Sequence, residues 1–229
     1  MEVIRSVCMF ALALLLGSCG PRQEQGVALP PFDAAFARLS PEEIVLLPLA
    51  TSFEMPMGGE QGALVYNAQP FRTTRHLGDD LNGVGGWNSD LGDPVYAAGN
   101  GRVIYSGVPG PGWGNMIILA HRVPDAESAR GWRIYQTVYA HLETRLAGTG
   151  DQVRRGAKIG TVGTANGRYF AHLHFEVRRS TSVYPGLGYA DAPLDRVSPE
   201  TFLAAHRTLP EATLLPAVPN LDGQAAQGR

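Results

Sequence analysis

Cysteine, lysine and excess charge are all scarce in this sequence. Its 229 residues include two cysteines, Cys8 and Cys19, and both lie within the first twenty positions. Lysine occurs once, at Lys158, and the 19 basic and 21 acidic side chains leave a formal net charge of -2. Because nucleic-acid binding requires an excess of positive charge to meet the phosphates, the sequence predicts no nucleic-acid partner.

The N-terminal segment lacks an apolar run long enough to cross a bilayer. Arg5 precedes an apolar stretch of about ten residues, 7–16, which is typical of the hydrophobic region of a signal peptide. The stretch leads into Leu-Gly-Ser-Cys at 16–19, which resembles a bacterial lipobox. An ordinary signal peptide with a chance cysteine is the alternative.

The lipobox interpretation predicts an exported lipoprotein. Residues 1–18 would be the signal peptide, Cys19 the lipidation site that anchors the protein to a membrane, and 19–41 a tether. Gly20, rather than Asp, follows Cys19 and favours the periplasmic face of the outer membrane of a Gram-negative bacterium. Cys8 would be removed, so the mature domain would have neither a disulfide nor a free thiol, which excludes a catalytic cysteine.

Glycine and proline, by contrast, make up about a fifth of the chain, against an average of about 12%. Because long helices contain few of either, this composition favours short strands and turns. We predict one all-β, mainly antiparallel domain over 42–207, with one short helix over 198–206 and a disordered tail over 208–229. The candidate strands are 44–49, 63–66, 116–121, 134–142, 157–162 and 172–178, with a hairpin joining 95–98 to 101–105.

One candidate strand carries two histidines. Alternation along 172–177 puts His172, His174 and Glu176 on one face and apolar residues on the other. Two imidazoles spaced in this way can both bind one metal ion, or one can bind it while the other lies beside it. We expect Glu176 to be an exposed strand residue, the alternative being that it orients a histidine.

A second segment offers a histidine and a carboxylate. If the chain is extended there, His76, Gly78 and Asp80 share a face, and Gly78 leaves room for an ion. Asp79 then points away, so Asp80 is the candidate ligand. The alternative is a polar turn that leads into the Asn-Gly pair at 82–83.

Two imidazoles and one carboxylate are the ligand set of a catalytic zinc with an open fourth position. Calcium and magnesium prefer oxygen ligands alone, and a structural zinc usually includes cysteine, which the mature domain is predicted to lack. We therefore predict one Zn²⁺ and catalysis. His141 lies in a further candidate strand, on the same face as Thr137 and Tyr139; by itself it indicates only a hydrogen-bonded structural histidine.

Several more motifs occur in order along the chain. They are the His-x-x-x-Asp segment at 76–80, Gly-Asp-Pro-Val-Tyr-Ala-Ala at 92–98, Gly-Arg-Val at 101–103, Gly-Asn-Met at 114–116, Tyr-Ala-His-Leu at 139–142, Gly-Asp-Gln-Val at 150–153, Gly156 with Ile-Gly at 159–160, and His-Leu-His-Phe-Glu at 172–176. Together they resemble the lysostaphin-like or LytM-type zinc metallopeptidases, which cut cross-links or stem peptides of bacterial peptidoglycan. The resemblance covers about residues 70–180. It implies an antiparallel β domain with a loop-bounded groove, and a zinc-activated water that attacks a peptide bond of peptidoglycan.

The resemblance also implies roles for five residues. His76, Asp80 and His174 would bind the zinc, and His141 and His172 would be the catalytic histidines. We expect His172 to take the proton of the attacking water and His141 to stabilise the oxyanion or the leaving amine, although the sequence leaves open which of the two is the base.

Two insertions depart from the pattern, at 81–91 and 124–132. We expect both to lie near the groove and to affect the choice of substrate. Trp87 and Trp113 are candidate substrate platforms, the alternative being that each caps its own loop. His121 and His206 are expected to be structural or solvated.

Two other functions are alternatives to the endopeptidase. A non-catalytic adaptor that binds peptidoglycan or activates a hydrolase would typically lack one or more site residues, whereas all five are present here. A periplasmic zinc-handling protein would have no need of the two catalytic histidines. The bond that is cleaved, whether a D-alanine–diaminopimelate cross-link, a glycine bridge or a protein, is not specified by the sequence.

Overall fold

The computed structural model describes residues 37–59 and 64–207. The chain divides into two units, Met1–Asp33 and Ala34–Arg229, and every described element belongs to the second. The predicted signal peptide, Cys19 and the tail over 208–229 lie outside the described residues. None of the helices in the described ranges is both long enough and apolar enough to cross a membrane.

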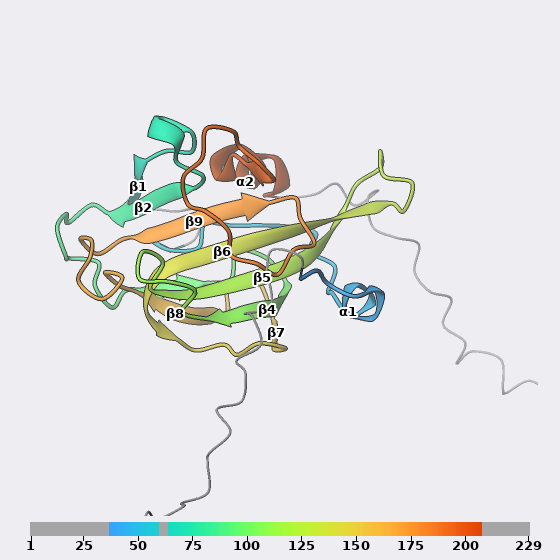
Figure 1. Cartoon of the computed structure of the whole chain (residues 1–229), viewed down its shortest axis with the longest axis horizontal. Helices are drawn as coiled ribbons and strands as arrows, with labels where there is room; N and C mark the ends of the chain where they lie inside the picture. Colours follow the sequence, from blue (N-terminus) through green and yellow to red (C-terminus); the bar gives the residue numbers. More distant parts are fainter. Residues whose placement is uncertain (1–36, 60–63, 208–229) are drawn as a thin grey trace, which may run out of the picture. The chain divides into compact units, whose positions relative to one another are not determined.

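Within the described residues, ten strands form one antiparallel sheet (Figure 1). They are β1 (Val65–Gln69), β2 (Asp79–Gly83), β3 (Pro94–Tyr96), β4 (Gly101–Gly107), β5 (Asn115–Pro124), β6 (Trp132–Arg145), β7 (Gln152–Val153), β8 (Lys158–Val162), β9 (Leu173–Arg178) and β10 (Arg196–Val197). The main order is β1-β2-β9-β6-β5-β4-β7, with β10 beside β9, and with β8 pairing both β3 and β6. The predicted all-β class is confirmed.

The central strands are buried on both faces. Alternate residues of β5 enter two different apolar clusters, Ile117 and Leu119 on one side and Met116 and Ile118 on the other. In β9 the odd-numbered residues 173–177 join the larger cluster, whereas the even-numbered ones are polar and yet also buried. Because a polar group buried in this way requires partners, the polar face of β9 is where a functional network is expected.

The predicted hairpin between 95–98 and 101–105 is wrong. β3 pairs with β8, and β4 pairs with β5 and β7. The chain does bend over residues 98–100, directly before β4 begins at Gly101, but it leaves the bend toward a different part of the sheet. The residue types at 100–101 therefore indicate where the chain bends, but not which strands β3 and β4 pair with.

The first predicted strand, 44–49, is also wrong, because its beginning is helical. α1 (Pro41–Val45) has Ser40 as its N-cap, Pro41 in its first turn, and a capping box in which the Ser40 and Glu43 side chains each accept from the other's backbone N–H. Leu39, assigned to the tether by the sequence, is buried. The predicted C-terminal helix is present as α2 (Pro199–His206), capped by Ser198.

The insertion at 124–132 does not lie near the groove described below, contrary to expectation. It closes the far end of the β5–β6 hairpin, where Pro124 pairs with Trp132, whereas Asn115 pairs with Leu142 at the other end. The two ends are roughly 30 Å apart at the usual rise per strand residue. Figure 1 shows this end of the hairpin projecting beyond the neighbouring strands.

Candidate metal centre

Strand register brings Asp80 and His174 together. β2 and β9 are antiparallel neighbours in which Asp80 lies opposite His174 and Asp79 opposite Phe175. Alternation then separates the two aspartates, since paired residues share a face. The Asp79 carboxylate accepts the Phe71 backbone N–H at 2.8 Å, whereas Asp80 Oδ1 lies 3.0 Å from His174 Nδ1.

His76 reaches this pair from a turn in front of β2. A short 3-10 segment, Thr73–Arg75, precedes it, and His76 forms an isolated bridge with Tyr189. Gly78 allows the close approach to β9, because a Cβ there would lie 2.6 Å from the Phe175 carbonyl oxygen and 2.9 Å from the His174 ring. Only a glycine fits at this position without moving the strand.

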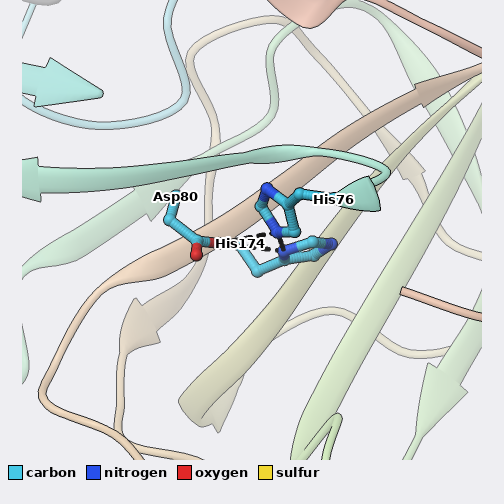
Figure 2. A group of neighbouring side chains, drawn as sticks. All are labelled: His76, Asp80 and His174. Carbon is cyan, nitrogen blue, oxygen red and sulfur yellow. Dashed lines mark hydrogen bonds and ion pairs between the residues drawn. The ribbon is translucent and has the colours of Figure 1, made fainter. Parts of the chain in front are cut away.

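The three side chains converge on one point (Figure 2). His76 Nε2 lies 3.0 Å from His174 Nδ1 and 3.3 Å from Asp80 Oδ1. Ligand atoms placed 2.0–2.1 Å from a tetrahedral zinc are about 3.3 Å apart, so the observed separations fit a zinc ion with little movement. The donor set and its spacing therefore suit zinc.

His141 and His172 complete the cluster. His172 Nε2 lies 3.6 Å from Asp80 Oδ1, and the His141 ring centroid is 4.8 Å from that of His172 and 5.5 Å from that of His174. Simple alternation predicts His141 on the same face of the strand as Tyr139. Tyr139 belongs to the larger core cluster, on the side of the sheet away from His174. His141 instead has a positive φ of 63°, which breaks the alternation and turns the imidazole toward His174.

Each of the four imidazoles has one ring nitrogen engaged by a group outside the cluster. The Nδ1 atoms of His76, His141 and His172 lie within hydrogen-bond distance of main-chain carbonyls, those of Gln69 at 3.1 Å, Trp113 at 3.2 Å and Phe170 at 2.7 Å. His174 is reversed, because its Nε2 faces the Glu176 carboxylate. A ring N–H donated outward leaves the other nitrogen's lone pair directed into the site.

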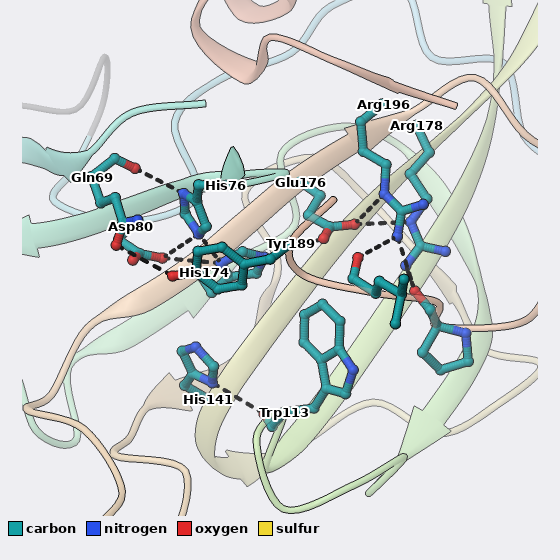
Figure 3. A network of polar contacts seen from close by, with 12 residues as sticks. Gln69, His76, Asp80, Trp113, His141, His174, Glu176, Arg178, Tyr189 and Arg196 are labelled. Carbon is teal, nitrogen blue, oxygen red and sulfur yellow. Dashed lines mark hydrogen bonds and ion pairs between the residues drawn. The ribbon is translucent and has the colours of Figure 1, made fainter. Parts of the chain in front are cut away.

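Glu176 is fully buried, so its expected exposure on the strand is wrong. Its Oε1 is 3.2 Å from His174 Nε2, and its Oε2 accepts from Arg178 Nε at 3.0 Å and from Arg196 Nε at 3.1 Å (Figure 3). The structure has the alternative instead, in which Glu176 contacts a histidine. The two arginines that make the burial possible lie farther along the chain.

The electrostatics of the cluster centre on Asp80. Burial raises the pKa of Asp80, but hydrogen bonds to His174 and His76 outweigh it and hold that pKa well below its usual range. Burial likewise opposes the charged form of His174, yet its contacts with Asp80 and Glu176 raise its pKa to about 9. Burial, together with the charges of His174 and His172, lowers the pKa of His141 to about 3.

The cluster opens into a groove of about 1110 Å³. All five predicted site residues line it, together with Trp113, Asn82, Asn88 and Leu91, the last three from the predicted insertion near the groove. The centroids of the Trp113 and His174 rings are 5.4 Å apart. Trp87 is 77% exposed, packs edge-on against Phe170 at 5.1 Å, and is not among the lining residues.

Sequence reasoning missed Tyr189 and Tyr169 on the groove wall. The Tyr189 ring is 5.1 Å from that of His76, and the Tyr169 ring is 4.8 Å from that of His141. No spacing rule connects Tyr189 to a histidine more than a hundred positions earlier. Tyr169 lies close to His172 in sequence, but its loop has no periodic pattern from which its direction could be deduced.

These features define a β-sheet domain with a buried His-Asp-His cluster suited to a metal and open to a groove. Residues 82–185 match the family model described as Peptidase family M23. Lipoprotein NlpD of Yersinia enterocolitica is 37% identical over 95 residues, which cover 41% of this chain and 87% of that protein. The chain belongs to peptidase family M23.

Longer relatives also match over 95 residues of this chain, which spans about a third or less of their length. Uncharacterized lipoprotein YgeR of Escherichia coli is 38% identical over 95 residues, 41% of this chain and 34% of that protein. Murein hydrolase activator NlpD of Escherichia coli is 36% identical over 95 residues, 41% of this chain and 22% of that protein. Among solved structures, the catalytic domain of the antimicrobial peptidase lysostaphin from Staphylococcus simulans is 23% identical, covers 61% of this chain and 90% of its own, and has a TM-score of 0.42.

Proposed function

We propose that this chain is a zinc-dependent endopeptidase that hydrolyses peptide bonds of bacterial peptidoglycan, in a cross-link or a stem peptide. The single observation that carries the proposal is the convergence of His76, Asp80 and His174 beside His141 and His172 at the floor of one groove. A metal-storage site would have no need of two further histidines whose free nitrogens face the same space.

His76, Asp80 and His174 would hold the zinc, through Nε2, a carboxylate oxygen and Nδ1 respectively. When bound, zinc supplies a Lewis acid that polarises a carbonyl and lowers the pKa of water toward about 7. The protein contributes the orientation of the ligands, because the outward contacts of both imidazoles fix which nitrogen faces inward.

His172 is the proposed general base. Its Nδ1–H is donated to the Phe170 carbonyl, so Nε2 carries the lone pair that accepts a proton from the attacking water. Asp80 Oδ1, 3.6 Å from that Nε2, stabilises the imidazolium that forms. The same Nε2–H can then be donated to the leaving amine, so one residue serves as base and then as acid.

His141 is held in the same way by the Trp113 carbonyl, and its ring contacts that of His172. We propose that it lies against the reacting carbonyl and contributes to the stabilisation of charge there. Trp113, close to His174 on the groove wall, is the more direct candidate for a substrate contact; Trp87, with Phe170, offers an exposed aromatic surface at a neighbouring loop.

Digestion of purified sacculi by the zinc-loaded chain tests the proposal. We expect mass spectrometry to detect muropeptides that have lost a peptide cross-link or a stem residue, and to find none of these products with His172→Ala. Intact muropeptides after incubation with the zinc-loaded wild type would overturn the proposed activity. The masses of the products would also identify the bond.

A non-catalytic activator is the second candidate, because the Escherichia coli and Salmonella relatives are named murein hydrolase activators. Such a protein would increase cleavage by a separate hydrolase and release no muropeptide by itself. Its effect would also survive His172→Ala, which distinguishes the two functions in one experiment.

The proposed location is the periplasmic face of the outer membrane of a Gram-negative bacterium, with the chain anchored through an acylated Cys19. The relatives named lipoproteins support this location. Peptidoglycan would then be within reach of the domain, because the tether between Cys19 and the described domain is about twenty residues long.

A further inference from the structure

Glu176 joins the candidate metal ligand His174 to two buried arginines. One carboxylate oxygen is 3.2 Å from His174 Nε2, and the other accepts from the Nε atoms of Arg178 and Arg196 at 3.0 and 3.1 Å. All four side chains are buried. A charged carboxylate is the group that can accept from all three donors at once.

The two arginines also hold a stretch of main chain. Arg178 donates to the Tyr184 carbonyl at 2.8 Å and to the Pro185 carbonyl, and Arg196 donates to the carbonyls of Pro185 at 3.2 Å and Leu187 at 3.0 Å. The segment 184–187 therefore passes directly over the guanidinium groups. Gly186 permits this, since its φ is 75° and a Cβ there would lie 2.9 Å from an Arg196 nitrogen.

The same segment continues into the groove wall and returns to the other histidine ligand. The Leu77 backbone N–H donates to the Gly188 carbonyl at 2.9 Å, and Tyr189 bridges to His76. Gly188 and Tyr189 both line the groove. The contacts thus form a closed ring from His174 through Glu176, Arg196 and the groove wall to His76. Figure 3 shows the part of this ring from His174 through Glu176 to the two arginines.

We propose that Glu176 and Arg196 are positioning residues that hold His174 with Nδ1 turned toward the metal and, through the same contacts, fix the groove wall at 184–189. The metal-binding part rests on the proposed zinc site, whereas the fixing of the wall depends only on the described contacts. Zinc affinity and the order of the wall should consequently change together when either residue is altered.

The direction of the effect follows from the hydrogen bonds. Glu176→Gln keeps one acceptor for His174 but places amide N–H groups against two guanidinium groups, so the carboxylate bridge is lost. Loss of such an outer contact weakens metal binding by about 10–100-fold. Arg196→Lys keeps the positive charge, but a single ammonium group lacks the planar fork that contacts both Glu176 and the wall carbonyls.

The test measures zinc affinity by competition with a chromophoric chelator, and hydrogen exchange of the amides over 184–189, on the full chain. We expect both variants to bind zinc more weakly, Glu176→Gln by at least about 10-fold, and both to exchange faster over 184–189. Glu54→Gln is the matched control, because it removes the partly exposed ion pair with Arg155, neither residue of which lines the groove, and it should leave both quantities unchanged.

A third measurement separates positioning from general stability. In the zinc-loaded wild type, the His174 Nε2–H donated to Glu176 should give a ring N–H resonance that is protected from solvent, and this resonance should broaden in Glu176→Gln and persist in Glu54→Gln. If Glu176→Gln does not fold, Arg196→Lys carries the test. Zinc affinity and wall exchange that equal the wild-type values in the folded variants would overturn the proposal.

Failure of this proposal is distinguishable from failure of the proposed activity. Zinc affinity, exchange and the ring N–H are all measured without substrate. A wild type that binds zinc but releases no muropeptide would refute the endopeptidase and leave the positioning role standing; unchanged affinity and exchange in both variants would refute the positioning role whether or not the wild type is active.

Discussion

Asp80 and His174 lie directly opposite each other on β2 and β9, with Oδ1 and Nδ1 3.0 Å apart. Their approach is therefore set by strand register, since a slip of one residue would turn both side chains to the opposite face. His76 is held differently, by a turn and by its bridge to Tyr189. Two of the proposed ligands come from the sheet and one from a loop, so zinc binding would require both the strand register and the loop to be in place.

Removing any one of the three proposed ligands should weaken zinc binding. The purified chain should contain about one zinc, and His76→Ala, Asp80→Ala and His174→Ala should each lower the zinc content, because three protein ligands leave none to spare. Zinc measured by atomic emission after dialysis provides the test, with His206→Ala as a control, since His206 stacks on Phe202 in α2. Full occupancy in any of the three would remove that residue from the ligand set.

His172→Ala and His141→Ala should separate catalysis from metal binding. Both should retain zinc, and hydrolysis of muropeptides should fall by about 10²–10⁴-fold for His172, which loses proton transfer, and by about 10²–10³-fold for His141. Rates on isolated muropeptides, normalised to zinc content, measure the effect. Loss of zinc from His172→Ala would mean that His172 and His174 have each other's roles.

Gly78→Ala should damage the site without removing a ligand. An added Cβ would meet the Phe175 carbonyl at 2.6 Å and the His174 ring at 2.9 Å, so β9 must shift and the free energy of unfolding should fall by about 1–3 kcal/mol. Zinc affinity should fall with it. Gly110→Ala is the matched control, since its Cβ would meet nothing within 4 Å, and chemical denaturation of the two variants provides the comparison.

The convergence of His76, Asp80 and His174 could be predicted from the sequence, because a histidine, glycine and aspartate at alternate positions, and the His-x-His pair, are local patterns that strand geometry converts directly into side-chain direction. The sequence did not predict the direction of a side chain where that direction depends on backbone conformation or on residues far away in the chain. His141 faces the site only through its positive φ, and Glu176 is buried only because Arg196, twenty positions later, supplies a second guanidinium group. Pairing of β3 with β8 was hidden for the same reason.

Cys19 lies outside the described residues, and its lipidation can be tested in cells. If Cys19 is acylated, Cys19→Ser should move the protein from the membrane fraction to the soluble exported fraction, because the apolar stretch before it is too short to span a bilayer. Fractionation followed by immunoblotting measures the change, with Cys8→Ser as the control. A Cys19→Ser protein that stays in the membrane fraction would contradict the lipoprotein interpretation.

Acid sensitivity of the fold should depend on His121, which is buried at a distance from the groove. Its Nδ1 lies 2.6 Å from the Asn100 carbonyl oxygen and its Nε2 lies 2.8 Å from the Thr137 hydroxyl, an arrangement that suits a neutral ring. Burial lowers the pKa of His121 to about 4, against about 6.5 when unfolded. The unfolded chain therefore binds the proton first, and stability falls as the pH drops from 6.5 to 4.

The size of that loss is about 3 kcal/mol for this one group, complete below pH 4, because each pKa unit corresponds to 1.36 kcal/mol at 25 °C. The free energy of unfolding of His121→Gln should be lower than that of the wild type at pH 7. Because the glutamine does not titrate, this free energy should fall less steeply toward pH 4. Urea denaturation of both metal-free chains at several pH values between 7 and 4 measures the two slopes. Equal slopes would mean that His121 is protonated in the folded domain as readily as in the unfolded chain.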